Sequence, residues 1–171
     1  RAGFYGPSQA SGNQCTACGA GRYARNSSFG KTTADFCLDC PAGRASNATG
    51  RSSRCDNCSA GFFSENLGAK SCDSCPAGWY QKNDNKPFCL PCLQGSYGAN
   101  DGTTVCKKCP AGFFQNMSEQ TFCFEAVTGL AEGNGSTAVR KCPAGKFMDV
   151  KTRPAECRVC PAGKFSDSQG F

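Results

Sequence analysis

The chain has 171 residues, 16 of them cysteine, with a net charge of +6 and no histidine. Leu, Ile, Val and Phe together make up about 13% of it, below the roughly 20% expected of a chain with an ordinary hydrophobic core. This composition excludes the conventional enzyme folds with large aliphatic cores, so either disulfide bonds hold the chain together or it is disordered.

A repeat of about 17 residues runs through the chain. The repeat reads Cys-Pro-Ala-Gly-x-aromatic, about ten polar residues, and then Cys-x-x-Cys. Successive cysteines at a constant spacing of 17 residues are Cys55, Cys72, Cys89, Cys106 and Cys123. In chain order we expect a partial repeat at 1–18, repeats at 19–40, 41–58, 59–75, 76–92, 93–109, 110–142 and 143–160, and a partial repeat at 161–171.

Two further columns of the repeat indicate its fold. Glycine occupies one column in all nine aligned copies, and an aromatic residue follows two positions later in eight of them, with Ala45 as the exception. Pro after Cys favours a turn, and Gly supplies a positive φ or a close backbone approach. The aromatic side chain is the only large apolar group of most units, so we expect it to cover the neighbouring disulfides.

The segments between these columns are rich in turn-forming residues and lack helical periodicity. A unit of this length cannot bury a core by itself, so units must pack on one another. The sequence therefore predicts a small, disulfide-rich, mostly irregular fold with short β-strands, in which tandem units form an elongated rod.

Residues 124–141 depart from the repeat, because they separate Cys123 from Cys142 where a Cys-x-x-Cys pair is expected. We expect an inserted surface loop here. The functional alternative is a loop that docks a partner.

Three chemistries compete for cysteines in this pattern. A structural zinc site also uses paired Cys-x-x-Cys motifs, but zinc ribbons come as separate four-cysteine modules, whereas here the pairs recur at a constant interval. A thioredoxin-like redox pair needs a βαβ setting, which the sequence does not show. We therefore expect structural disulfides, no metal, and no cofactor apart from N-linked glycans.

Five Asn-x-Ser/Thr sequons support an extracellular setting, in which disulfides persist. No apolar run is long enough for a membrane span, and the basic residues are scattered, which indicates solubility rather than nucleic-acid binding. The chain has no signal-peptide pattern, so we expect it to be a piece of a longer secreted or cell-surface protein. The predicted N-glycosylation sites are Asn26, Asn47, Asn57, Asn116 and Asn134.

Two disulfide schemes fit the spacing. In one, neighbouring pairs interlock in fours and all the cysteines are used. In the other, the second cysteine of each pair bonds to the first cysteine of the next, which leaves Cys15 and Cys160 open-ended or intermolecular. We favour this second arrangement, because the chain begins and ends within a repeat. It predicts the bonds Cys18–Cys37, Cys40–Cys55, Cys58–Cys72, Cys75–Cys89, Cys92–Cys106, Cys109–Cys123 and Cys142–Cys157.

The unit Cys-x-x-Cys-Pro-Ala-Gly-x-aromatic resembles the ephrin-receptor-like cysteine-rich repeat, a relative of the tumour-necrosis-factor-receptor module. Residues 37–123 follow this pattern continuously. The resemblance implies extended, disulfide-bonded extracellular repeats, and the favoured pairing is similar to that of the simplest receptor module. Such repeats occur in receptors, adhesion proteins, surface antigens and flagellar filaments, so the resemblance selects no single function and carries over no ligand-contacting residue.

Catalysis is not expected, because histidine is absent and no nucleophile, metal or phosphate motif occurs. The first hypothesis is a glycosylated extracellular spacer or filament subunit, of cell-surface or flagellar-hair type. Its partners would be neighbouring repeats or copies of itself in a longer array or head-to-tail assembly. The alternative is a segment of a receptor ectodomain that binds another extracellular protein. Under the spacer or filament hypothesis, the outward rings of paired aromatics such as Phe113 and Phe114 are candidates for a lateral assembly contact.

Overall fold

The computed structural model describes residues 4–5, 16–24, 36–127, 129–149, 151–152 and 155–166. Its regular elements are short strands, and these ranges contain no α-helix. The chain divides into two units, one of residues 1–75 and 81–90 and the other of residues 76–80 and 91–171.

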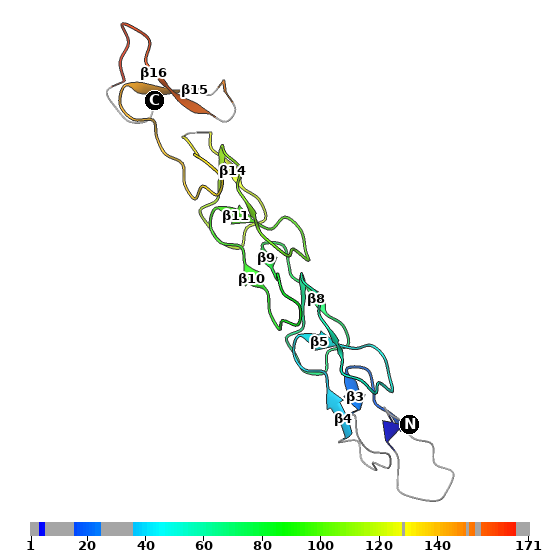
Figure 1. Cartoon of the computed structure of the whole chain (residues 1–171). Coiled ribbons are helices and arrows are strands. Elements are labelled where there is room, and N and C mark those ends of the chain that lie inside the picture. The colour runs from blue at the N-terminus through cyan, green and yellow to red at the C-terminus, as the bar shows by residue number, and fades with distance from the viewer. Residues whose placement is uncertain are drawn as a thin grey trace, which may run out of the picture. The chain divides into compact units, whose positions relative to one another are not determined.

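Short antiparallel hairpins make up both units, and each strand pairs with its neighbour in the chain (Figure 1). The strands of the first unit are β1 (Phe4–Tyr5), β2 (Thr16–Ala17), β3 (Arg22–Ala24), β4 (Cys37–Asp39), β5 (Arg44–Ala45), β6 (Asp56–Asn57), β7 (Phe62–Phe63) and β8 (Asp73–Ser74). Those of the second unit are β11 (Ser96–Tyr97), β12 (Lys107–Lys108), β13 (Phe113–Phe114), β14 (Phe124–Glu125), β15 (Lys146–Asp149) and β16 (Glu156–Val159). One more sheet joins β9 (Trp79–Tyr80) and β10 (Leu90–Pro91). The prediction of short strand pairs with little helix is confirmed.

The repeat 59–75 illustrates why each unit of sequence forms a hairpin. Gly61 has a φ of +84°, a conformation that glycine adopts without strain, and the turn it makes leads into β7. In the hairpin, Phe62 lies opposite Ser74 and Phe63 opposite Asp73. The N–H of Cys75 donates to the carbonyl oxygen of Gly61 at 2.8 Å. The glycine column thus begins each hairpin, and the next cysteine pair ends it.

Seven disulfides close these hairpins, with Cα–Cα distances of 5.5 to 5.8 Å. They join the second cysteine of one pair to the first cysteine of the next, 14 to 19 residues later. The bonds are Cys18–Cys37, Cys40–Cys55, Cys58–Cys72, Cys75–Cys89, Cys92–Cys106, Cys109–Cys123 and Cys142–Cys157. Cys160 is half-buried and forms no disulfide, and Cys15 lies outside the described residues.

Sulfur atoms and small or amide side chains form the buried core. The first cysteine of each disulfide is at most 1% exposed, and the buried polar residues are Ser46, Ser64, Gln81 and Gln115. The repeated aromatic residues, such as Phe63 and Tyr97, are only half-buried. The rings therefore lie at the edge of a core that the disulfides occupy.

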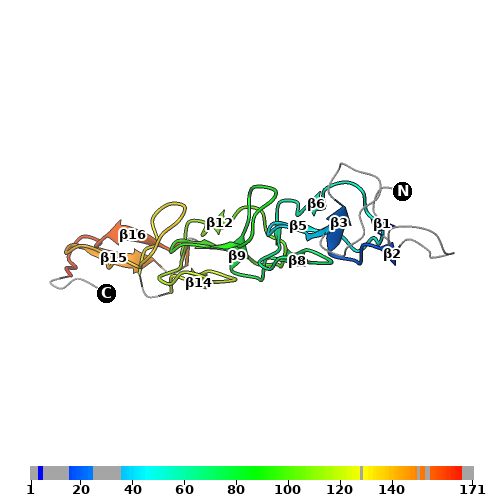
Figure 2. The ribbon, with the colours of Figure 1, turned by 90° about the horizontal axis from the view of Figure 1, so that it is seen from below.

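Hydrogen bonds between main-chain groups join each repeat to the next one. The N–H of a repeat glycine donates to a carbonyl oxygen about twenty residues later, as from Gly61 to Gln81 and from Gly95 to Gln115, at 2.7 and 2.8 Å. The acceptors of these two bonds, Gln81 and Gln115, are among the buried polar residues. Successive hairpins in Figures 1 and 2 are therefore joined by backbone bonds as well as by the chain itself.

A second set of contacts reaches the repeat after next. The N–H of Asn85 donates to the carbonyl oxygen of Cys58, and the N–H of Glu119 donates to that of Cys92, each at 2.7 Å. Asn85 and Glu119 have positive φ values of 59° and 66°. A Cβ added at Gly43 would lie 2.7 Å from the carbonyl carbon of Asn85. The glycine column therefore serves close approach between second-neighbour repeats as well as the turn.

Residues 126–142 contain the hydrogen bonds of a repeat without its disulfide. Ala126 is buried, and its N–H donates to the carbonyl oxygen of Gly112 at 2.8 Å, as the second cysteine of a pair does elsewhere. Leu130 and Arg140 form an antiparallel bridge with two hydrogen bonds of 2.7 and 2.8 Å. We expected an inserted loop at 124–141, and we interpret the segment instead as a repeat in which Ala126 and Val139 stand at the cysteine positions.

Candidate functional site

The disulfides account for fourteen cysteines, so none of these is available as a thiolate for zinc or for redox exchange. Within the described ranges no group of three or more His, Cys, Asp or Glu side chains could hold a metal ion. No helix in the same ranges is long and apolar enough to cross a membrane. The candidate functional features that the described residues present are surface clusters, ion pairs, sequons and one cavity.

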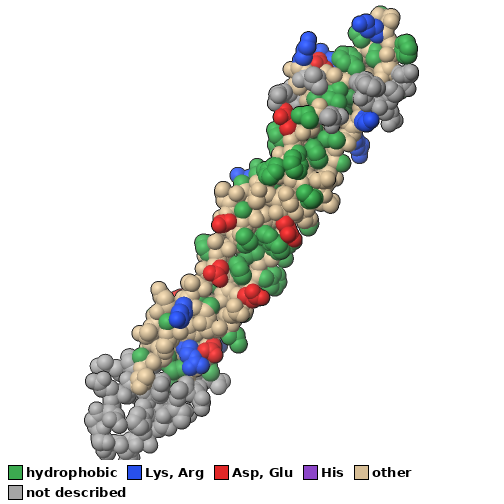
Figure 3. Space-filling model, turned by 180° about the vertical axis from the view of Figure 1, so that it is seen from behind, with side chains coloured by type: hydrophobic (Ala, Val, Ile, Leu, Met, Phe, Trp, Pro, Cys, Tyr) green, Lys and Arg blue, Asp and Glu red, His purple; other side chains and the backbone are tan. Residues whose placement is uncertain are grey.

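Exposed apolar side chains are the first such feature, and Figure 3 shows hydrophobic side chains at the surface of one face. Of the exposed apolar side chains, the rings of Phe122 and Phe124 are 51% and 40% exposed. Phe124 lies opposite Phe114 in the hairpin of β13 and β14, with ring centroids 5.9 Å apart. Phe122 and Phe124 meet edge-on at 5.0 Å. These three rings form an aromatic cluster, which distinguishes them from apolar residues scattered singly over the surface.

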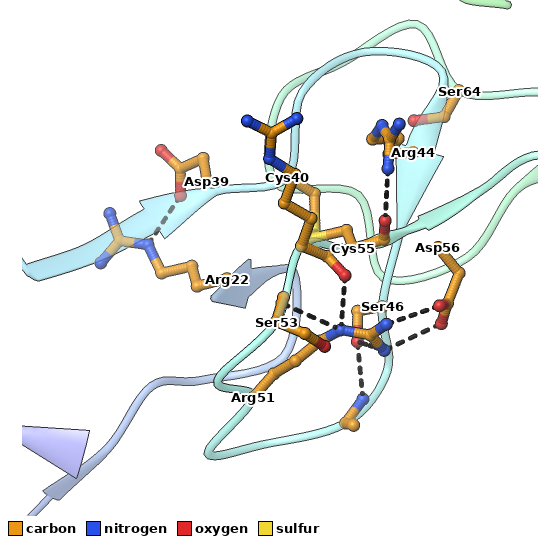
Figure 4. The surroundings of a disulfide bond; sticks show 12 residues. Arg22, Asp39, Cys40, Arg44, Ser46, Arg51, Ser53, Cys55, Asp56 and Ser64 are labelled. Carbon is orange, nitrogen blue, oxygen red and sulfur yellow. Dashed lines mark hydrogen bonds and ion pairs between the residues drawn. A yellow bond between two sulfur atoms is a disulfide. The ribbon is translucent and has the colours of Figure 1, made fainter. Parts of the chain in front are cut away.

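Ion pairs on the first unit surround the Cys40–Cys55 disulfide (Figure 4). The guanidinium of Arg51 donates to both carboxylate oxygens of Asp56, at 2.8 Å for Nη1. The same group donates to the carbonyl oxygens of residues 53 and 54. The hydrogen bond from Arg51 lowers the pKa of Asp56, desolvation opposes this, and the charges of Arg51 and Arg44 add to the lowering. This arrangement orders the turn before β6.

The sequons lie where an N-glycan has room, as far as the structure describes them. Asn47, Asn57, Asn116 and Asn134 are all exposed. Asn57 lies in β6, between two disulfide-bonded cysteines, whereas the other three lie outside strands. Asn26 falls outside the described residues. Glycosylation at these positions stays a prediction.

A cavity of about 310 Å³ lies in the segment 126–142. Both a carboxylate and a guanidinium line it, without a nucleophile and base in contact. The lining includes Leu130, Glu132, Ser136, Thr137, Ala138 and Arg140.

Sequence reasoning missed two sets of residues that recur at a constant place in the repeat: the buried glutamines, and the residues with a positive φ that are not glycine. Gln81 and Gln115 lie in polar, turn-rich segments, where burial is unexpected. Each occurs three residues after the repeat glycine, and that constant offset is the signal that could have identified them. The positive-φ residues Asn85 and Glu119 follow at a constant offset of seven, where other repeats have Gly50 and Gly68.

Comparison with known protein families gives one match. Residues 43–84 and 68–104 each match the family described as tyrosine-protein kinase ephrin type A/B receptor-like. The matched segments overlap and together contain the disulfides Cys58–Cys72 and Cys75–Cys89. A search of curated proteins found no match for the chain.

Proposed function

We propose that this chain, whose residues 43–104 match an ephrin-receptor-like family, is a non-enzymatic extracellular spacer or filament subunit, built as an elongated, disulfide-bonded and glycosylated series of repeats. The match to this family and the many disulfides support an extracellular location. The spacer role is the finer part of the proposal. Its partners are neighbouring repeats or further copies of the chain.

The observation that carries the spacer role is the contact between second-neighbour repeats. If each repeat touched only the next, every junction could bend independently. The bond from Asn85 to Cys58 ties a repeat to the one two places before it, so bending the intervening junction must break this bond as well. The equivalent bond from Glu119 to Cys92 does the same in the second unit. Within each unit, these bonds favour stiffness.

The disulfides support the same role under tension. A pull on the chain passes through the sulfur bridge and bypasses the residues inside each closed loop. A stapled repeat can then lengthen only through the three-residue spacing of Cys-x-x-Cys, about 10 Å of extended chain. A protease cut inside a closed loop also leaves the chain connected, because the disulfide still joins the two parts.

A receptor ectodomain is the second candidate, and the family description favours it, since the matched family is named for a receptor. The exposed cluster of Phe114, Phe122 and Phe124 is the feature on which a protein ligand could bind. A receptor segment predicts saturable binding to a monomeric chain, whereas a filament subunit predicts self-association.

Small-angle scattering of the oxidised chain tests the spacer proposal. A compact domain of 171 residues has a radius of gyration of about 16 Å. We expect a clearly larger value with a constant cross-section, and a further increase on reduction to the unfolded value of about 44 Å. A radius near the compact value would contradict the proposal. Sedimentation at rising concentration, with electron microscopy of the same samples, then separates self-association from a monomer that awaits a ligand.

A further inference from the structure

One face of the hairpin formed by β13 and β14 leaves aromatic surface in contact with water. Phe114 and Phe124 are cross-strand partners on this face, and Phe122 lies two residues before Phe124. Their rings form a continuous cluster with centroid distances of 5.9 and 5.0 Å. Phe122 is 51% exposed, so apolar area remains that a covering group could remove from water.

Asn116 lies beside this cluster. Side chains of an extended chain alternate between faces, and Gln115 is fully buried while Asn116 is exposed. The register that places Phe114 opposite Phe124 brings Asn116 opposite Phe122 when it is continued by two residues. β13 ends at Phe114, and from this register we infer that Asn116 lies on the side of the hairpin that carries the rings.

The side chain of Gln115 fixes this position. Its Nε2 donates to the carbonyl oxygen of Phe122 at 2.8 Å, and its Oε1 accepts the N–H of Met117 at 3.1 Å. Gln115 is thus bonded to the backbone of Phe122, and Met117 is bonded to the side chain of Gln115. These two bonds hold the chain on both sides of Asn116 in the same turn.

Asn116 is also the first residue of the sequon Asn116-Met-Ser118. Of the four sequons that the structure describes, it alone has an aromatic residue two positions earlier. The residues at that offset before the other three asparagines are Ala45, Cys55 and Glu132. An N-glycan on Asn116 is therefore a covering group for which the sequence contains the attachment signal.

We propose that Asn116 carries an N-glycan whose first N-acetylglucosamine packs its C–H face on the rings of Phe114, Phe122 and Phe124. Attachment follows the ordinary chemistry of N-glycosylation from a lipid-diphosphate-linked oligosaccharide. The Asn116 Nδ2 forms a bond to C1 of the sugar, the C1–O bond to the diphosphate breaks, the lipid diphosphate leaves, and the amide loses one proton. This proposal rests on the extracellular location in the proposed function.

The repeat 76–92 provides an internal control for the geometry. Gln81 Nε2 donates to the carbonyl oxygen of Phe88 at 2.7 Å, and Gln81 Oε1 accepts the N–H of Asn83 at 3.1 Å. Phe88 is 56% exposed, as Phe122 is 51% exposed, but Lys82 stands in the position of Asn116. This repeat has the scaffold and the exposed ring without the glycan.

The test uses the full chain secreted by a eukaryotic host and kept oxidised, with disulfides and occupancy of Asn116 checked by mass spectrometry. Hydrogen exchange of residues 113–124 is compared between protein trimmed to a single N-acetylglucosamine and the Asn116→Gln variant. We expect the sugar to slow exchange three- to tenfold, about the effect of one good ring contact. The effect should vanish in Phe122→Ala and persist in Phe88→Ala.

Nuclear Overhauser effects between protons of the sugar and of Phe122 provide a second readout that requires no variant. An unoccupied Asn116 would overturn the proposal. An occupied Asn116 with no exchange difference and no sugar–ring contacts would overturn it as well. Neither result changes the radius of gyration that tests the spacer role, so the two proposals fail separately.

Discussion

The backbone N–H of Asn85 donates a hydrogen bond of 2.7 Å to the carbonyl oxygen of Cys58, two repeats earlier in the chain. The turn that makes this bond has a positive φ at Asn85 and lies against the repeat glycine Gly43. A disulfide closes each repeat along the chain, and this bond joins repeats that the disulfides do not connect. The arrangement of the repeats within each unit therefore depends on the disulfides and on this kind of backbone hydrogen bond.

Replacing Gly43 with Ala tests the contact between second-neighbour repeats. The added Cβ would meet the carbonyl group of Asn85 at 2.7 Å, and a φ of +80° strains any L-residue. We expect a loss of about 3 kcal/mol or more of local stability, since backbone strain of 1–3 kcal/mol adds to the clash. Hydrogen exchange at the Asn85 amide measures it.

Gly145→Ala is the matched control for that variant. Gly145 has a φ of +79°, but a Cβ there would meet nothing within 4 Å. We expect only the strain of the left-handed conformation, about 1 kcal/mol. Equal losses at both positions would show that the close approach of Gly43 to Asn85 contributes no stability.

The sequence predicted the short hairpins because they depend on local spacing. The positive φ at Gly61 follows from the turn that begins each repeat, whereas the spacing alone allowed two disulfide schemes. The contact of Gly43 with Asn85 could not be predicted, because it depends on how successive hairpins rotate, which no single repeat encodes. The repeat at 126–142 was missed because Ala126 and Val139 replace the residues that define the pattern.

Burial of Gln81 was missed for a different reason. Polar residues between turns usually face water, but Gln81 is 2% exposed and both ends of its amide are bonded. Sequence reasoning expected outward rings only in adjacent pairs such as Phe113 and Phe114, and it did not identify the cluster around Phe122. Its actual neighbours depend on the pairing of β13 with β14, which the sequence left open.

Replacing Gln81 with Glu tests whether the buried amide orders the turn. The carboxylate keeps the acceptor for Asn83 but loses the donor to Phe88, and a charge is buried. We expect local stability to fall by about 2–4 kcal/mol at neutral pH, with partial recovery in acid as the carboxyl group is protonated. Hydrogen exchange at Asn83 reports the change. Gln94→Glu, at an exposed position, should leave stability unaltered, and a similar loss there would refute the role of burial.

The pair of Arg51 and Asp56 predicts an acid-sensitive turn before β6. Hydrogen bonding from Arg51 lowers the pKa of Asp56 below its ordinary value of 3.8. A lowered carboxyl pKa contributes stability above the unfolded value, and this stability is lost as pH falls through the folded value. The effect is small because Asp56 is exposed. Carbon-13 titration of the Asp56 carboxyl should give a lowered pKa that returns to the ordinary range in Arg51→Gln. An Asp56 pKa that does not respond to this substitution would contradict the assignment.

The repeat at 126–142 should be the part of the described chain that opens most readily under oxidising conditions. The amide of Ala126 in this repeat and the amide of Cys109 in an earlier repeat donate equivalent hydrogen bonds, of 2.8 and 2.9 Å. Of these, only the repeats around Cys109 have disulfides. A disulfide closing a loop of this length is worth about 3 kcal/mol, so we expect the Ala126 amide to exchange about a hundredfold faster than that of Cys109.

Limited trypsin digestion without reductant should cleave first beside Arg140 and Lys141, and should separate the chain into two pieces. In a Cys75→Ser/Cys89→Ser variant, the repeat 76–92 should become equally accessible. Equal exchange of the two amides in the unmodified chain would mean that packing alone stabilises residues 126–142 as well as a disulfide does elsewhere.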